Sequence, residues 1–177
     1  MDQTNMDFEK IDAHQIEIND DHIIVLGKDT DASFYGVVTI EVILSQVNDL
    51  VVRKLRIQDY ANTKIRGVIE GFYGIPWSHE DRISLMKFGA KFKANTFVFA
   101  PKDDPYHREK WQELYPEEML EDIAELARLG NETKNRFVWT ISPLGEVAHL
   151  ARTAGQEAVM ELLEENTERM LQKFDQL

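Results

Sequence analysis

Residues 95–107 read NTFVFAPKDDPYH, a short apolar run that ends abruptly in charged and polar residues. Thr96 to Ala100 predicts a strand of a parallel sheet covered on both faces, because such strands carry near-continuous apolar side chains. The residues after Ala100 predict a loop, and the helical pattern of Glu117 to Leu129 follows that loop. A buried strand, a polar loop and a helix form the repeating unit of a parallel α/β fold.

The same unit is expected on either side of this stretch. Before it, Ile65 to Glu70 predicts a strand, and Ser78 predicts the start of a helix in which Asp81 completes a capping box. After it, Phe137 to Ile141 predicts a third strand, and Gln156 to Leu177 predicts a last helix. We therefore expect three βα units in sequence.

Spacing at three and four residues predicts which side of each of these helices is buried. Gly130 and Asn131 are expected to stop the middle helix, as residues that tolerate a left-handed conformation often do. The predicted apolar faces consist of Ile83, Met86 and Ala90, of Met119, Ile123, Leu126 and Ala127, and of Leu163, Met170, Phe174 and Leu177.

Residues 16–57 predict a smaller unit in the order strand, strand, helix, strand. Ile16 to Ile18 and His22 to Leu26 read as strands around a polar turn, and Asp31 is the expected N-cap of the next helix. Val51 to Ile57 returns to strand character. The helix is expected to bury Val37, Ile40, Ile43, Leu44 and Val47.

A polar connector at Asp59 to Lys64 is the expected boundary between the two parts. The predicted organisation is a small α+β domain over residues 1–62, followed by a parallel α/β domain over residues 63–177. Because the first part shows no cluster of chemically reactive side chains, the site is expected in the second.

Composition excludes several classes of function. The 177 residues include 20 basic and 32 acidic side chains, a net charge of −12, which argues against nucleic acid or an anionic membrane surface as partner. Without cysteine there is no disulfide or thiolate zinc site, and the five histidines lack metal-ligand spacing, so no metal or cofactor is expected. No apolar run is long enough to span a membrane, and the first residues lack a signal-peptide pattern.

Function in a parallel α/β array collects where strands end and loops begin. At the first strand end, Gly71 and Gly74 either admit a ligand close to the backbone or serve as turn glycines. At the second, Lys102 is either a ligand-binding cation or a surface lysine. Asp103 and Asp104 are either an acid/base pair or acceptors for loop amides. Trp77, Trp111 and Trp139 are expected to be packing residues rather than sugar platforms.

Two of these stretches carry a resemblance to a known family. Residues 66–78, RGVIEGFYGIPWS, and residues 95–107 resemble the first and second barrel strands and loops of family 84 glycoside hydrolases. That family comprises β-N-acetylglucosaminidases, including bacterial hyaluronidase-type hexosaminidases and the O-GlcNAcases. Residues 27–39, GKDTDASFYGVVT, are similar to the non-catalytic domain that precedes the barrel in bacterial members.

The resemblance implies a (β/α)8 TIM barrel, of which about three of the units would lie in residues 63–177. It implies cleavage of terminal β-linked N-acetylglucosamine by substrate-assisted catalysis, with an oxazoline intermediate. Gly71, through its carbonyl, and Lys102 match groups that hold sugar hydroxyls, and Tyr73 matches an aromatic of the pocket wall. The catalytic aspartates of the family follow the fourth barrel strand, so they are expected beyond Leu177, not at Asp103 and Asp104.

The expectation that follows is a part of a glycosidase that is inactive as an isolated chain, with glycans or glycoproteins containing N-acetylglucosamine as partners. A secreted or cell-surface location is suspected from the family alone. The alternative is a non-enzymatic carbohydrate-binding or interaction protein. In that case an oligomer or a complementing chain would cover the open edge of the sheet, because uncovered strand edges favour association.

Overall fold

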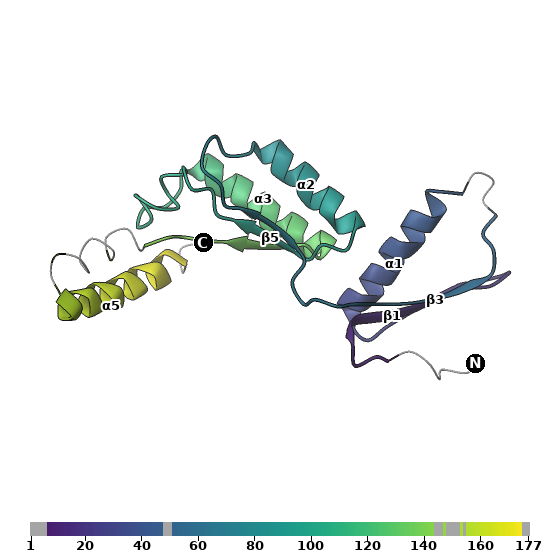
Figure 1. Ribbon diagram of the computed structural model, residues 1–177. Helices are drawn as coiled ribbons and strands as arrows, with labels where there is room; N and C mark the ends of the chain where they lie inside the picture. Colours follow the sequence, from purple (N-terminus) through teal and green to yellow (C-terminus); the bar gives the residue numbers. More distant parts are fainter. Residues whose placement is uncertain (1–6, 48–50, 144–146, 148–152, 154, 175–177) are drawn as a thin grey trace.

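The computed structural model describes residues 7–47, 51–143, 147, 153 and 155–174. They form two three-stranded sheets with helices, arranged along the chain as two successive units (Figure 1). The first unit contains β1 (Ile11–Ile18), β2 (Ile23–Gly27), α1 (Thr30–Leu44) and β3 (Leu55–Ala61). The second contains β4 (Gly67–Glu70), α2 (His79–Lys91), β5 (Thr96–Phe99), α3 (Glu117–Thr133), β6 (Arg136–Trp139) and α5 (Gly155–Phe174).

The first sheet is antiparallel, in the order β2-β1-β3, and α1 packs on it. The predicted order of strand, strand, helix and strand is confirmed. β3, however, begins at Leu55 and pairs with β1 as far as Ala61, so Asp59 lies in a strand and not in the predicted connector. Its carboxylate is held there by the Lys93 ammonium at 2.6 Å.

Helix α1 corrects two predictions. Its N-cap is Asp29, not Asp31, because the Asp29 side chain accepts a hydrogen bond from the Ala32 amide at 2.8 Å. Its buried face is centred on Gly36, where an added Cβ would lie 2.4 Å from Val25 of β2. This close approach turns the predicted face partly outward, so Val37 and Leu44 are 46% and 43% exposed. The residues actually buried are Ala32, Tyr35, Gly36 and Val38.

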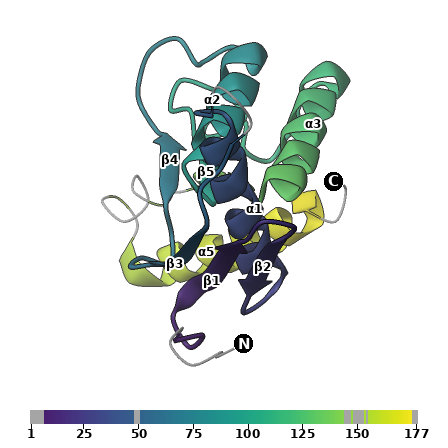
Figure 2. The ribbon, with the colours of Figure 1, turned by 90° about the vertical axis from the view of Figure 1, so that its right-hand side faces the viewer.

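The second sheet is parallel, in the order β4-β5-β6, and α2 and α3 lie side by side against it (Figure 2). Ser78 and Asp81 form the predicted capping box at the start of α2. The core on the helix side holds Met86, Phe97, Phe99 and Leu126. Parallel register aligns Ile69, Val98 and Val138 on the opposite face of the strands, where Ile69 and Val138 remain 66% and 39% exposed. β5 was expected to be covered on both faces. Among the described residues, the face toward α2 and α3 is covered and the opposite face of the sheet is largely open.

Helix α3 does not stop at Gly130 and Asn131 but ends after Thr133, where Lys134 adopts φ 55°. Gly130 lies within the helix on its buried side. An added Cβ would lie 2.8 Å from the Asn135 carbonyl oxygen and 2.9 Å from the Phe137 amide nitrogen. This glycine therefore allows helix and strand to approach closely. The buried residues of α3 are Leu126, Leu129 and Gly130, whereas Met119 and Ala127, both predicted to be buried, are exposed.

The last predicted strand and helix are only partly matched. β6 ends at Trp139, two residues before the predicted end, and α5 begins at Gly155. Leu163 and Met170 are half-buried on α5, as expected for an apolar face. Leu177 and the side chain of Phe174 lie outside the described residues. None of the helices in the described part of the chain is long and apolar enough to cross a membrane.

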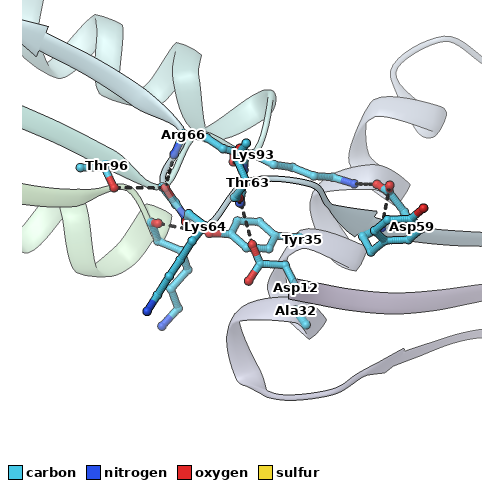
Figure 3. Close-up of polar contacts among 12 residues, drawn as sticks. Asp12, Ala32, Tyr35, Asp59, Thr63, Lys64, Arg66, Lys93 and Thr96 are labelled. Carbon is cyan, nitrogen blue, oxygen red and sulfur yellow. Dashed lines mark hydrogen bonds and ion pairs between the residues drawn. The ribbon is translucent and has the colours of Figure 1, made fainter. Parts of the chain in front are cut away.

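The two units meet at a polar junction, which we call the seam, at the N-terminal ends of β4 and β5 (Figure 3). The Arg66 guanidinium contacts the Asp12 carboxylate at 2.7 Å and the carbonyl oxygens of Lys93 and Thr63 at 3.1 and 2.8 Å. The Arg66 backbone amide donates to the Asn95 side chain at 2.9 Å. One arginine therefore joins the first sheet, the connector and the entry to β5.

His14 lies buried in this seam. Its Nδ1 is 2.8 Å from the Asp12 carbonyl oxygen, so Nδ1 carries the proton, and its Nε2 is 3.3 Å from the Lys93 ammonium. Asp12 and Lys93 both adopt left-handed φ angles, 53° and 59°, which non-glycine residues rarely adopt. The backbone is thus held in uncommon conformations where the two units join.

Candidate active-site region

The C-terminal ends of β4 and β5 bring two loops together. Glu70 and Phe99, the last residues of these strands, are register partners, and the Ala100 amide donates to the Glu70 carbonyl at 3.2 Å. Two residues further, the Lys102 amide donates to the Phe72 carbonyl at 3.2 Å. The loop after β4 and the loop after β5 therefore run beside each other, as expected of neighbouring parallel strands.

Tyr73 and Lys102 stand at the open side of these loops. The Lys102 ammonium is 5.7 Å from the centre of the Tyr73 ring, and the Arg108 guanidinium is 5.9 Å from the same ring. Tyr73 is 67% exposed, and Lys102 and Arg108 are also exposed. The surface thus presents an aromatic face with two cations in reach, which suits a polar ligand with a flat apolar side.

The two loop glycines differ in role. Gly74 adopts φ 107°, a conformation that favours glycine, and its amide donates to the Asp103 carboxylate at 2.7 Å. Gly74 is therefore a turn glycine. Gly71 directly follows β4 and is half-buried, and an added Cβ would lie 3.0 Å from the Ile69 side chain. Gly71 lies at the strand end, and its binding of a ligand through the carbonyl stays a prediction.

Asp103 and Asp104 serve the loop in separate ways. Asp103 is exposed and accepts from Gly74, whereas Asp104 is 6% exposed and accepts from the Tyr115 hydroxyl at 2.7 Å and the Tyr106 amide at 2.9 Å. Burial and the bond to Asp104 raise the pKa of Tyr115 well above its usual range, so this hydroxyl stays protonated and donates. These contacts agree with the interpretation of both aspartates as hydrogen-bond acceptors within the loops.

Glu70 is the residue of this region that sequence reasoning did not single out. Its side chain is fully buried, and its carboxylate accepts two bonds from the Arg82 guanidinium at 2.8 Å each and one from the Trp77 amide at 3.0 Å. Arg82 also lies 4.8 Å over the Phe99 ring. An acidic residue at the end of an apolar strand is a usable signal, because buried charges need partners, but the partner cannot be read from the sequence.

The remaining histidine and tryptophan side chains near the loops are structural. His107 is buried, with Nδ1 2.9 Å from the Thr140 carbonyl oxygen, and its own carbonyl accepts from the Ser142 amide at 2.7 Å. Trp111 is buried, and Trp77 and Trp139 pack against the core, in agreement with their predicted packing role. Among the residues that the structure describes, there is no cluster of side chains able to hold a metal ion.

Comparisons with known proteins give a consistent result. The model of the β-N-acetylglucosaminidase family matches residues 66–177. The protein O-GlcNAcases of Rattus norvegicus and Mus musculus are each 43% identical to this chain over 77 residues. Those 77 residues are 44% of this chain and 8% of each relative.

Solved structures extend the likeness to the first unit. The structure of CpGH84D has a TM-score of 0.83 and 44% identity over 96% of this chain, and that of CpGH84B has a TM-score of 0.74 and 31% identity over 97%. The chain covers 28% and 30% of those two proteins. It therefore spans less than a third of the length of the solved relatives, and a smaller share of the O-GlcNAcases.

Proposed function

We propose, from the premise that this chain belongs to the β-N-acetylglucosaminidase family, that it supplies part of the sugar pocket of a glycoside hydrolase. The substrates of this family contain N-acetylglucosamine, and we assign a terminal β-linked N-acetylglucosamine to the loops after β4 and β5. Gly71, Tyr73 and Lys102 are the residues proposed to bind it. Independently of this assignment, the match to the family model and to related proteins confirms, at the level of the family, the resemblance drawn from residues 66–78 and 95–107.

The observation that supports this proposal is that the loops after two neighbouring strands run beside each other and bring Lys102 close to Tyr73, with Gly71 at the end of the first strand. The Lys102 ammonium can donate to sugar hydroxyls, and the Gly71 carbonyl can accept from them. The Tyr73 ring, 5.7 Å from the same ammonium, offers a flat face for the C–H side of the sugar. The amide of Lys102 holds the two loops together through Phe72.

We further propose that hydrolysis follows the substrate-assisted route of the family. The acetamido oxygen of the sugar attacks the anomeric carbon while an acid protonates the departing glycosidic oxygen, which gives an oxazoline. Water, deprotonated by the same carboxylate, then opens the oxazoline with overall retention. Two carboxylates of different pKa are required, one to orient the acetamido group and one to exchange the proton.

Asp103 and Asp104 are not proposed as this pair, because their carboxylates accept bonds from Gly74, Tyr106 and Tyr115. We place the catalytic pair outside these 177 residues, and we expect no hydrolysis by the chain alone. Turnover of an aryl β-N-acetylglucosaminide by the pure chain, lost in Asp103→Asn, would contradict both statements.

We also propose that β4, β5 and β6 are strands of a TIM barrel, with residues 1–62 as a separate non-catalytic domain. The exposed side chains of Ile69 and Val138, on the face away from α2 and α3, support this, because the inner face of such a barrel is filled by branched apolar residues. Pairing of β3 with the first sheet up to Ala61 supports a boundary at residues 62–63.

The same exposed face supports one alternative, a non-enzymatic protein whose open sheet is covered by a second copy or by another chain. Sedimentation velocity tests whether a second copy of the chain covers this face. A stable monomer over a wide concentration range would argue against self-association, whereas a dimer disrupted by Val138→Lys would favour it. Val42→Lys changes an equally exposed valine on α1 and serves as the matched control, which should leave such a dimer intact.

Sugar binding is tested by NMR titration of the chain with methyl β-N-acetylglucosaminide. We expect shift changes at Gly71, Tyr73 and Lys102, and loss of binding in Lys102→Ala. Lys110→Ala removes an exposed lysine from the same loop and is expected to bind as the unchanged chain does. Equal loss in both variants, or no shift changes in the unchanged chain, would refute the proposed site.

A further inference from the structure

We propose that two carboxylates, Glu70 and Asp103, are positioning residues for the sugar site, and that neither contacts the sugar. They fix the loop formed by residues 71–77 against the loop that carries Lys102. This inference rests on the proposed function, since it concerns how the Gly71 carbonyl and the Lys102 ammonium are kept in place for the sugar hydroxyls.

Glu70 closes the loop from the inside. Glu70 immediately precedes the loop, and its carboxylate accepts from the amide of Trp77, the last loop residue, at 3.0 Å. The same carboxylate is bound by the Arg82 guanidinium through two bonds of 2.8 Å. Because Glu70 is fully buried, these bonds work in a low dielectric, where a charged pair with good geometry is firmly held.

Arg82 extends this anchor to the second strand. Its guanidinium lies 4.8 Å over the ring of Phe99, the last residue of β5. The chain continues from Phe99 through Ala100 and Pro101 to Lys102. The ion pair of Glu70 and Arg82 therefore contacts the ends of both strands. In this way it fixes the distance between Gly71 and Lys102.

Asp103 fastens the loop from the outside. Its carboxylate accepts from the amide of Gly74 at 2.7 Å, and Gly74 occupies the turn of the loop with φ 107°. Asp103 is the neighbour of Lys102, whose amide donates to Phe72. The tip of the loop and its first half are therefore both tied to the segment that carries the ammonium.

This arrangement has a consequence for the affinity of the site. A loop already held in its binding conformation loses less freedom when the ligand arrives, so affinity rises without any added contact. Loss of Asp103 is expected to weaken binding about fivefold, the equilibrium value of one hydrogen bond. The effect should come with greater motion of the loop in the absence of sugar.

The experiment compares Asp103→Ala, Asp103→Asn and Glu109→Ala in the same 177-residue chain. Asparagine retains an oxygen that can accept from Gly74, and Glu109→Ala removes an exposed carboxylate from the same loop as a charge-matched control. Two quantities are measured: the Kd for methyl β-N-acetylglucosaminide by NMR titration, and the hydrogen-exchange rate of the Gly74 amide without sugar.

The positioning role requires that Asp103→Ala weaken binding and speed Gly74 exchange, while Asp103→Asn and Glu109→Ala leave both near their original values. Faster exchange with an unchanged Kd would overturn the role. A weaker Kd with unchanged exchange would overturn it too, because Asp103 would then contact the sugar itself. No binding by the unchanged chain would refute the proposed function, which the other outcomes leave intact.

Glu70→Gln tests the inner anchor separately. Glutamine keeps an acceptor for the Trp77 amide but removes the charge that faces Arg82, so weaker sugar binding and faster exchange of the Trp77 amide are expected in the folded chain. If this variant does not fold, Arg82→Lys takes its place, because lysine keeps the positive charge but cannot form the bidentate contact with Glu70. Sugar binding and exchange of the Trp77 amide are then measured in that variant. Folded Arg82→Lys with unchanged Kd would overturn the role of the pair.

Discussion

The two ends of the parallel sheet are built differently. At the N-terminal ends of β4 and β5, Arg66 bonds to a carboxylate and two carbonyl groups in the seam (Figure 3). His14 is buried there beside Lys93. At the C-terminal ends, the ion pair of Glu70 and Arg82 lies beneath the loops, while Lys102 and Tyr73 remain exposed. At the first end the polar groups bond to one another, whereas the exposed side chains of the second end are those that we propose for a ligand. Such a division is expected if the sheet belongs to the proposed barrel, because the two ends of barrel enzymes separate stability from function.

The largest difference between the ends is expected from two glycine substitutions. At the seam end, an alanine Cβ at Gly67 would lie 1.6 Å from the Thr96 carbonyl oxygen, so β4 and β5 must move apart. Gly67→Ala should lower the free energy of unfolding by about 3 kcal/mol, at the upper range for overpacked sites. Urea unfolding followed by circular dichroism measures it, and a loss below about 1 kcal/mol would contradict the close contact between the two strands.

Arg66→Ala is expected to have the next largest effect. It leaves the Asp12 carboxylate and the carbonyls of Thr63 and Lys93 without this donor, and the Arg66 side chain is only 22% exposed. We expect a loss of about 2 kcal/mol in unfolding free energy. Arg108→Ala, at the exposed loop end, should change it by less than about 0.5 kcal/mol. Equal losses in the two variants would remove the contrast between the ends.

Gly74→Ala examines the open end in the same way as Gly67→Ala examines the seam. An added Cβ at Gly74 meets no atom within 4 Å, so only its φ of 107° is unfavourable. The expected loss is about 1 kcal/mol, from backbone strain alone. Urea unfolding of both glycine variants compares them directly. A larger loss of unfolding free energy for Gly74→Ala than for Gly67→Ala would contradict the proposed difference between the two ends.

The smallest expected effect is a pH dependence that belongs to the seam. Burial, together with the charge of Lys93, lowers the pKa of His14 below 6.5, although the bond to the Asp12 carbonyl and the carboxylates of Asp59 and Asp12 oppose the shift. Between the folded pKa and pH 6.5, the unfolded chain therefore binds a proton at His14 that the folded chain largely does not. This contribution to stability is complete above pH 6.5 and is lost as the pH falls from 6.5 through the folded pKa.

The comparison of His14→Gln with the unchanged chain isolates this effect from the other histidines. Thermal unfolding midpoints between about pH 7.5 and about pH 5 should fall less steeply for the variant. Identical slopes would show that His14 does not titrate differently in the two states.

Local pattern predicted much of the second unit. The apolar run from Thr96 and the capping box of Ser78 and Asp81 depend on neighbouring residues, and both are confirmed. The side-by-side course of the loops after β4 and β5 was also predictable, because neighbouring parallel strands place their loops at one edge. The family followed from the same two stretches.

Contacts between distant residues account for what the sequence did not reveal. Arg66 and Asp12 are 54 residues apart, and no spacing rule links them. The buried face of α1 depends on the close approach of Val25 to Gly36, and Gly130 is used for contact with β6 rather than for a helix stop. In each case tertiary packing determined the role of a residue whose local pattern favoured another.

The buried pair of Glu70 and Arg82 also bears on how this sequence can diverge. Replacing either partner alone leaves one buried charge without its counterpart, which is far more damaging than replacing both with apolar residues of similar volume. Single substitutions that remove either charge are therefore expected to lower stability more than a joint replacement does. Across descendants of this protein, positions 70 and 82 are expected to be kept together or exchanged together, as one inherited unit.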